Sequence, residues 1–144
     1  MTPEDLAALH ANAMKVPAPW SARDFAELLA HDGTFLIPMA QAFALGRTIL
    51  DEAELLTIVT HATYHRQGIA RKCLAAFETE AARRGAVKAF LEVAATNVPA
   101  RALYESAGWK ASGLRKAYYR SADRRIDAVL MEKTLDPHDV GTIG

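Results

Sequence analysis

The chain has little cysteine and no excess of charge of either sign, and both shortages exclude classes of function. Its 144 residues contain one cysteine, Cys73, so an intrachain disulfide is excluded and a reducing, cytoplasmic setting is expected. Cys73 falls on the apolar face of an expected helix, which predicts a core position. Lys plus Arg and Asp plus Glu number 17 each. Because broad nucleic-acid binding relies on summed positive charge, no direct nucleic-acid partner is predicted.

Long apolar runs and metal-ligand patterns are also missing. No run reaches the roughly 18 consecutive apolar residues that a membrane-spanning helix needs. The first residues, 1–5, lack the basic-then-apolar layout of a secretory signal. The histidines have no spacing with cysteine or acidic residues that is typical of a metal site. The sequence therefore predicts neither a membrane partner nor a metal.

Apolar residues make up 51% of the chain, and their periodicity divides it into helices and strands. Helices are predicted from Pro3, after an N-cap at Ser21, over 69–84, and after Asn97. Strands are predicted over 34–39, 41–50, 55–60, 89–94, 109–114 and 127–133, with an acidic turn at 51–54 and a polar turn at 120–125. This order predicts an α/β fold, with a mixed sheet and helices on both faces. We expect one domain over 1–136 and a flexible tail over 137–144.

The junction between the strand at 55–60 and the helix from 69 has the character of an anion site. Gly68 and Ala70 leave room for a ligand to approach the backbone, and Arg66 and Arg71 add positive charge. The first turn of a helix has N–H groups without intrahelical partners, and its dipole favours an anion. A phosphorylated ligand, most simply a pyrophosphate, fits this turn. A solvated basic turn that starts a helix fits it equally well.

Two common nucleotide-binding motifs are absent. Gly68 is not part of a G-x-G-x-x-G fingerprint, because no third glycine precedes Gly85, and no P-loop sequence occurs. These absences exclude the usual dinucleotide and P-loop sites and leave the ligand open.

A resemblance to a known family narrows the choice of ligand. The turn at 65–71 is similar to the acetyl-CoA signature of the GNAT N-acetyltransferases. Over about residues 3 to 135 the chain resembles the RimI-type branch, the ribosomal-protein-alanine N-acetyltransferases. The matching segments are 52–56, 68–71, 90–93, Asn97 with 100–104, 107–109, 115–116 with 118–119, and 127–128. Two features depart from the pattern: His65 stands where the signature has Gln or Arg, and the family's first strand has no counterpart before the first helix.

The resemblance implies a GNAT-like fold, with a central mixed, mostly antiparallel sheet, and acetyl-CoA as co-substrate. The implied cofactor-binding residues are Ile58, Val59, Thr60, Arg66, Gln67, Gly68, Ile69, Ala70, Arg71 and Asn97. The strand at 58–60 is implied to be splayed, so that its free N–H groups bind the pantetheine arm. From its residues alone it is an ordinary buried strand. Asn97 also fits a plain helix N-cap.

Glu92 and Tyr104 are the candidate catalytic residues. A carboxylate inside the apolar run 90–94 is costly unless it is partnered or functional, and partial burial suits a general base. An exposed sheet position or pairing with an arginine explains Glu92 as well, and Tyr104 fits a simple core residue. The resemblance implies that Glu92 takes a proton from the acceptor amine. It also implies that Tyr104 gives one to the departing thiolate.

The acceptor is less constrained by the sequence. The resemblance implies an N-terminal α-amine, of the type of a ribosomal protein's N-terminal alanine, with Tyr118 and Tyr119 as acceptor-site candidates. Cross-strand packing explains these tyrosines equally well. The acidic residues at 51–54 have two explanations: they attract a basic acceptor, or they form a solvated turn. A small amine, a lysine side chain, or a silent acyl-CoA-binding module remain alternatives. A monomer or a weak homodimer is expected, because an uncovered sheet edge invites pairing.

Overall fold

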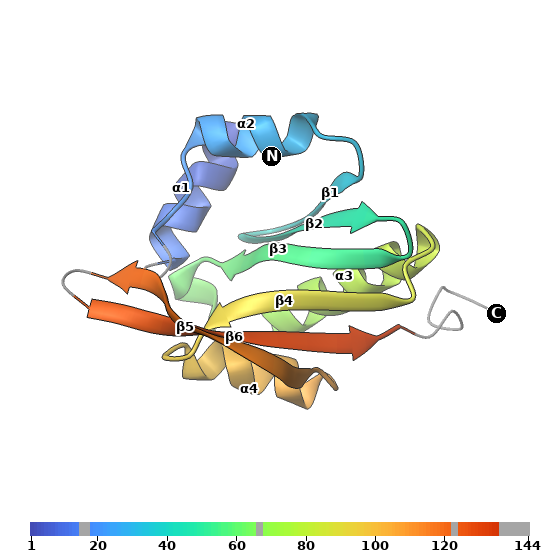
Figure 1. Ribbon diagram of the computed structural model, residues 1–144. Helices are drawn as coiled ribbons and strands as arrows, with labels where there is room; N and C mark the ends of the chain where they lie inside the picture. Colours follow the sequence, from blue (N-terminus) through green and yellow to red (C-terminus); the bar gives the residue numbers. More distant parts are fainter. Residues whose placement is uncertain (15–17, 66–67, 122–123, 136–144) are drawn as a thin grey trace.

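A six-stranded sheet forms the centre of the protein in a computed structural model that describes residues 1–14, 18–65, 68–121 and 124–135 (Figure 1). The strands lie in the order β1-β2-β3-β4-β6-β5, and among these described strands only the β3–β4 pair is parallel. Their bounds are β1 Thr34–Met39, β2 Ala42–Ile49, β3 Glu52–Thr60, β4 Lys88–Ala94, β5 Lys110–Ser121 and β6 Arg124–Thr134. The predicted mixed, mostly antiparallel sheet is confirmed.

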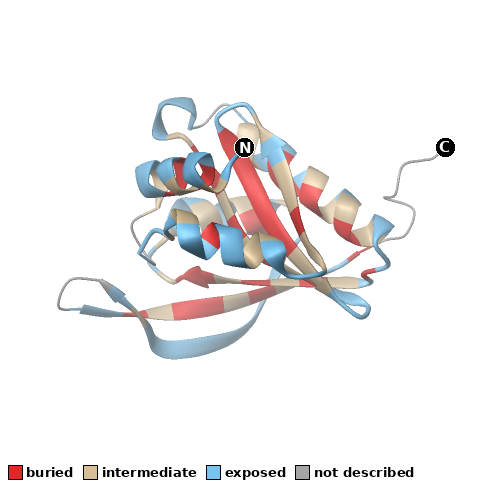
Figure 2. Cartoon of the chain, turned by 90° about the horizontal axis from the view of Figure 1, so that it is seen from above, coloured by how far each residue is buried: buried red, intermediate tan, exposed pale blue. Residues whose placement is uncertain are grey.

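Helices cover both faces of this sheet, as predicted. Their bounds are α1 Pro3–Ala13, α2 Ala22–Ala30, α3 Ile69–Arg83 and α4 Val98–Ser106, with a short 3₁₀ helix η1 at Ala62–Tyr64. Side chains of α1 and α2 share one buried cluster with β2 and β3, centred on Phe25 and Phe43. Side chains of α3 and α4 share a second with β1, β3, β4 and β6, centred on Phe77 and Trp109. The burial colouring follows these layers, whereas β5 is exposed along most of its length (Figure 2).

The first two helices begin where the sequence predicts, because each has a capping box. The Thr2 hydroxyl accepts from the Asp5 amide, and the Asp5 carboxylate accepts from the Thr2 amide. Ser21 and Asp24 repeat this arrangement at α2. Such reciprocal bonds pair backbone donors that a helix start leaves free. They fix the two helices that form one wall of the cleft described below.

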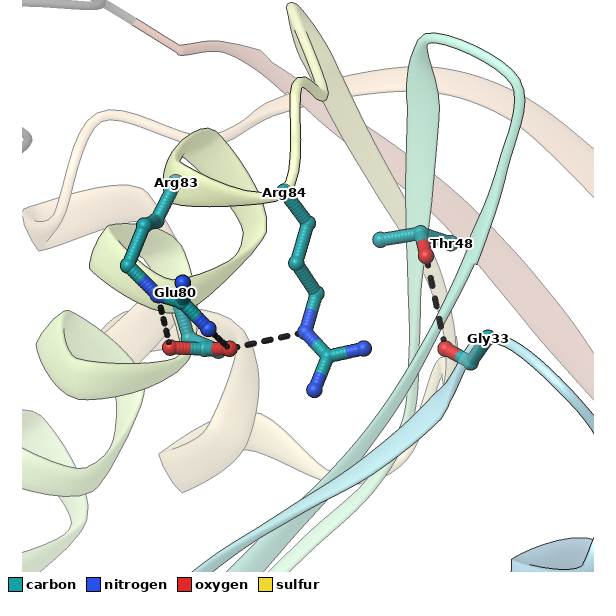
Figure 3. A network of polar contacts seen from close by, with 5 residues as sticks. All are labelled: Gly33, Thr48, Glu80, Arg83 and Arg84. Atoms are coloured by element: carbon teal, nitrogen blue, oxygen red, sulfur yellow. Dashed lines mark hydrogen bonds and ion pairs between the residues drawn. The ribbon is translucent and has the colours of Figure 1, made fainter.

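Glu80 holds the two arginines at the C-terminal end of α3, Arg83 and Arg84 (Figure 3). Glu80 accepts from Arg83 at 2.9 and 2.5 Å and from Arg84 at 2.7 Å, and the Arg83 hydrogen bond lowers the pKa of Glu80 to about 2. The Arg84 guanidinium lies 4.6 Å from the centroid of the Phe35 ring, which stacks on Phe77. The contact of Arg84 with Phe35 joins the C-terminal end of α3 to β1.

β3 and β4 pair over a short length only. Their register covers Glu52–Lys88, Ala53–Ala89 and Glu54–Phe90, after which the two strands part (Figure 1). β3 stays paired with β2 as far as Thr60, and β4 stays paired with β6 as far as Ala94. Backbone groups on the facing edges of the two strands therefore lack strand partners in the middle of the sheet.

Three strand boundaries differ from the sequence prediction by more than one or two residues. The predicted acidic turn at 51–54 belongs largely to β3, which begins at Glu52, because residues 52–54 pair with β2. Glu54 also forms an ion pair with Arg47 on β2 at 2.7 Å. β5 continues to Ser121 and β6 starts at Arg124, so the predicted polar turn at 120–125 is shorter. Long cross-strand pairing extends both strands beyond their apolar cores. The predicted tail at 137–144 lies outside the described residues.

Gly46 gives a test of the packing between β2 and α3. A Cβ added there would lie 2.5 Å from Phe77 Cε1 and 2.7 Å from Phe35 Cζ, so the stacked rings leave no room for a methyl group. We expect Gly46→Ala to lower the free energy of unfolding by about 1–3 kcal/mol through overpacking. Chemical denaturation measures this loss. The control Ala75→Ser adds one heavy atom at an exposed position of α3, and an equal loss there would contradict the explanation.

Candidate active site

The parted ends of β3 and β4 border a cleft that is lined by residues from both faces of the sheet. Thr57 and Ile58 from β3 and Glu92 from β4 line it, with Tyr104 from α4 and Tyr119 from β5. Leu91 and Val93 pack in the cluster of α3 and α4, so strand alternation turns Glu92 to the face that α1 and α2 cover. Tyr104 belongs to the opposite cluster. The cleft therefore brings Glu92 and Tyr104 together from opposite faces.

Glu92 has an arginine partner, which is one of the alternatives that the sequence left open. Arg115 Nη2 lies 3.2 Å from Glu92 Oε1, and the Glu92 side chain is 21% exposed. Arg115 itself is 53% exposed, and its guanidinium also lies over the Tyr118 ring. The carboxylate is thus held at the cleft wall by a surface arginine and still reaches solvent.

Tyr104 is a buried phenol on the other side of the cleft. Its ring lies 6.1 Å from that of Trp109, and 6% of the residue is exposed. Burial, with a smaller effect of Tyr119, raises the pKa of the Tyr104 hydroxyl. Tyr104 is therefore a core residue. Its hydroxyl keeps its proton at neutral pH, which is the state that a proton donor requires.

The N-terminus of α3 is open to a ligand. Gly68 adopts a left-handed conformation with φ of 75°. Among the described residues, no atom lies within 4 Å of its Cβ position and no side chain caps the helix. The first turn has no acidic residue. Arg71 donates to Ser106 Oγ on α4 at 2.5 Å. Of the other predicted residues of this turn, Ile69 and Ala70 form the first helical positions, and Arg66 and Gln67 lie outside the described residues.

His65, the irregular member of the signature, folds back onto β3. Its Nε2 donates to the Thr60 carbonyl oxygen at 2.8 Å. A carbonyl oxygen only accepts, so Nε2 carries the proton. His65 therefore ties the end of β3 to the turn that precedes α3.

The other predicted cofactor residues are divided by the fold. Ile58 lines the cleft, whereas the Val59 side chain packs in the cluster of α1 and α2. Thr60 Oγ1 is buried and has no hydrogen-bond partner among the described residues. Asn97 caps α4, accepting from the Ala100 amide at 3.3 Å, and also lines the cleft. The two interpretations of Asn97 are compatible.

The acceptor-side candidates are separated as well. Tyr119 lines the cleft, and burial raises the pKa of its hydroxyl to about 12. Tyr118 is 48% exposed, lies outside the cleft lining and contacts Tyr119 edge-on, with ring centroids 5.1 Å apart. No acidic residue of 51–54 lines the cleft, and Glu54 is paired with Arg47. The geometry of the cleft therefore does not support the expectation that these acidic residues attract a basic acceptor.

Cys73 has the core position that the sequence predicts. Cys73 is buried in the core, and burial raises the pKa of its thiol to about 12, which leaves it inert. Within residues 1–14, 18–65, 68–121 and 124–135, none of the helices combines the length and apolarity that crossing a bilayer requires.

His10 was missed as a site residue by sequence reasoning. It is 1% exposed, lines the cleft, and stacks on Trp20 with ring centroids 5.0 Å apart. The available signal was its spacing from Leu6, which places both residues on the buried face of α1. Burial lowers the pKa of His10 to about 4, so the ring is neutral at neutral pH.

Comparison with known proteins shows that the chain is an acetyltransferase by family. The model of the Acetyltransferase (GNAT) family matches residues 10–109, and the chain therefore belongs to the GNAT family. It is 38% identical over 130 residues to the [Ribosomal protein bS18]-alanine N-acetyltransferase of Escherichia coli K12, covering 87% of each chain. The crystal structure of the Escherichia coli ribosomal-protein-S18-alanine N-acetyltransferase superposes with a TM-score of 0.80 at 32% identity, covering 90% of this chain and 85% of that one. The resemblance to the RimI type is confirmed.

The family uses acetyl-CoA, and the residues here fit that molecule. The fold is shared with yncA of Salmonella typhimurium, solved with its cofactor acetyl-CoA (TM-score 0.76, 18% identity, covering 94% and 90% of the two chains). The open space at Gly68 and the uncapped amides of α3 suit a phosphate group. The Thr60 hydroxyl, which has no hydrogen-bond partner in the described part of the chain, and the parted edge of β3 suit a chain of amides.

The buried neutral His10 predicts a loss of stability in acid. Its folded pKa of about 4 lies below the ordinary histidine pKa of 6.5, so the unfolded chain binds the proton first as the pH falls. His10 thus stabilises the fold above about pH 6.5, and this contribution is lost as the pH falls toward about 4. We expect about 2–3 kcal/mol less unfolding free energy at about pH 4.5 than at about pH 7 from this group.

Urea denaturation at several pH values measures this loss. His10→Gln, which keeps a polar side chain without a titrating ring, is the matched control and has a shallower pH dependence. Equal pH dependence of the two proteins contradicts the assignment.

Proposed function

We propose that this protein transfers the acetyl group of acetyl-CoA to the N-terminal α-amine of a protein. The acceptor is of the type of a ribosomal protein with an N-terminal alanine, as in the bS18-alanine N-acetyltransferase to which the chain is similar. One observation carries the mechanism: Glu92 and Tyr104 line the same cleft from opposite faces of the parted sheet. A base and an acid are thereby available on the two sides of a reacting carbonyl.

Glu92 is the general base of this proposal. It takes a proton from the acceptor amine, directly or through a water, after which the neutral amine attacks the thioester carbonyl. An α-amine has an unperturbed pKa of roughly 8, against about 10.4 for a lysine side chain, so an α-amine demands less of the base. Tyr119 lies on the same wall, and Tyr118 and Arg115 lie beside it, as candidate contacts to the acceptor peptide.

Tyr104 is the general acid. Its raised pKa keeps the hydroxyl protonated until the carbon–sulfur bond breaks, and the proton then passes to the thiolate of CoA. Acetyl-CoA supplies the activated acyl group and the thiolate leaving group. The α3 amides after Gly68, with Arg66, Gln67, Ile69, Ala70 and Arg71, hold its pyrophosphate. The edge of β3 at Ile58, Val59 and Thr60, with Asn97, holds the pantetheine arm and polarises the carbonyl.

An acceptor of this type implies a cytoplasmic location. The proposed unit is a single domain over 1–136 that acts as a monomer or a weak homodimer. No metal takes part in the proposed reaction, since Glu92 and Tyr104 supply the proton transfers.

The proposed roles predict losses of turnover without losses of cofactor affinity. We expect Glu92→Gln and Tyr104→Phe each to lower kcat by about 100-fold or more, because each removes a proton-transfer group. Acetyl-CoA affinity, measured by calorimetry, stays within about twofold of wild type. Glu132→Gln is the matched control, since Glu132 is also ion-paired on a strand but contacts Lys88 and not the cleft. Full activity in both cleft variants contradicts the mechanism.

The proposal that the acceptor is an N-terminal α-amine predicts which amines the protein acetylates when several are offered. The protein is offered acetyl-CoA with peptides that differ in their first residue, and with lysine and polyamines. We expect acetylation of α-amines, fastest on a peptide that begins with alanine, with mass spectrometry locating the acetyl group. Fast acetylation of free amines without peptide turnover establishes the small-amine alternative instead. Tight acetyl-CoA binding without any turnover establishes a silent binding module.

A further inference from the structure

A buried histidine of α1 joins β3 to the segment that precedes α2 on the Glu92 side of the cleft. The Trp20 amide donates to His10 Nδ1 at 3.0 Å, and His10 Nε2 lies 3.1 Å from Thr57 Oγ1. Both His10 and Thr57 are less than a tenth exposed, and all three residues line the cleft. The catalytic steps above use none of them, although a buried polar pair of this kind costs stability unless it is fully bonded.

The Trp20 bond fixes the proton on the imidazole. Because Nδ1 accepts from a backbone amide, the single proton of the neutral ring sits on Nε2. The ring is neutral because burial holds its pKa near 4. Nε2 therefore donates to Thr57 Oγ1, and the hydroxyl oxygen accepts. The Thr57 proton itself finds no acceptor among the hydrogen bonds of the described residues.

An irregularity in β3 places this hydroxyl on the Glu92 side. The register with β2 passes from Leu45–Thr57 to Gly46–Leu55, so Leu56 is an extra residue in β3. Leu56 packs with the cluster of α1 and α2, and Thr57 contacts α1 on the same face. Without this bulge, alternation would turn the Thr57 side chain to the opposite face. Glu92 also faces α1 and α2, so the free hydroxyl proton and the proposed base share one side of the cleft.

We propose that the Thr57 hydroxyl donates a hydrogen bond to the first backbone carbonyl oxygen of the acceptor peptide. In this proposal His10 is the positioning residue that orients the hydroxyl. The His10 Nε2–H group binds one lone pair of Thr57 Oγ1. The hydroxyl hydrogen of Thr57 therefore points away from His10, into the cleft. The inference rests on the proposed function, since it assigns part of the acceptor site. It names an acceptor contact that neither Glu92 nor Tyr104 provides.

Replacing the hydroxyl tests the contact. Thr57→Val keeps the shape and removes the donor, and we expect the KM for the acceptor peptide to rise about five- to tenfold, the size of one lost hydrogen bond. The kcat and the KM for acetyl-CoA stay within about twofold, because the contact binds ground state and transition state alike. Thr57→Ser keeps the hydroxyl and restores the wild-type KM. An unchanged peptide KM in Thr57→Val overturns the proposal.

A double-mutant cycle tests the role of His10. His10→Phe keeps a ring against Trp20 and removes both hydrogen bonds, and it raises the peptide KM in the wild-type background. In the Thr57→Val background the same substitution has no further effect on the peptide KM, because His10 acts through the hydroxyl. Additive effects of the two substitutions show that His10 shapes the cleft without orienting Thr57, which overturns the positioning role.

The controls separate this inference from the proposed function. Melting temperatures of all variants are measured, and the kinetics are run well below the lowest of them. If the wild-type protein acetylates no α-amine, the proposed function fails and this inference fails with it. If the wild-type protein acetylates peptides normally and Thr57→Val has the wild-type KM, only the inference about Thr57 and His10 is wrong.

Discussion

The separation of β3 from β4 after Glu54 and Phe90 is the constraint on which the site depends. A continuous parallel pair would fill the centre of the sheet with backbone hydrogen bonds and leave no passage between its faces. Because each strand keeps its outer partner, the sheet remains intact while the two inner edges move apart. Buried backbone groups without partners are costly, so these edges suit a ligand that brings amides and a carbonyl of its own.

The two faces of the sheet have different chemical characters at this opening. On the side of α3 and α4 there is an uncapped helix start, an asparagine at the start of α4 and a phenol that keeps its proton. On the side of α1 and α2 there is a carboxylate paired with a surface arginine, and a neutral imidazole bonded to a threonine. Family membership assigns acetyl-CoA to this enzyme class, and the division suits a cofactor on one face and an acceptor on the other.

Much of the fold followed from local patterns. The capping boxes at Thr2 and Ser21, the glycine before α3 and the apolar runs of β1, β2 and β4 each act within a few residues, and the structure has these elements within a few residues of their expected bounds. The boundaries that differed depend on partners elsewhere. Glu52 and Glu54 form a strand because β2 lies beside them, and β5 and β6 lengthen because each supplies the other's hydrogen bonds.

The sequence by itself determined the element order, the glycine turn at the start of α3 and the place of Glu92 within an apolar strand. Only the tertiary structure decided that Arg115 pairs with Glu92, that His65 bonds back to Thr60, and that Tyr119 rather than Tyr118 lines the cleft. It also joined His10 to Thr57, residues 47 positions apart. The physical reason is the range of the interactions: propensity and capping act along the chain, whereas burial and side-chain pairing depend on which distant elements the packed core brings together.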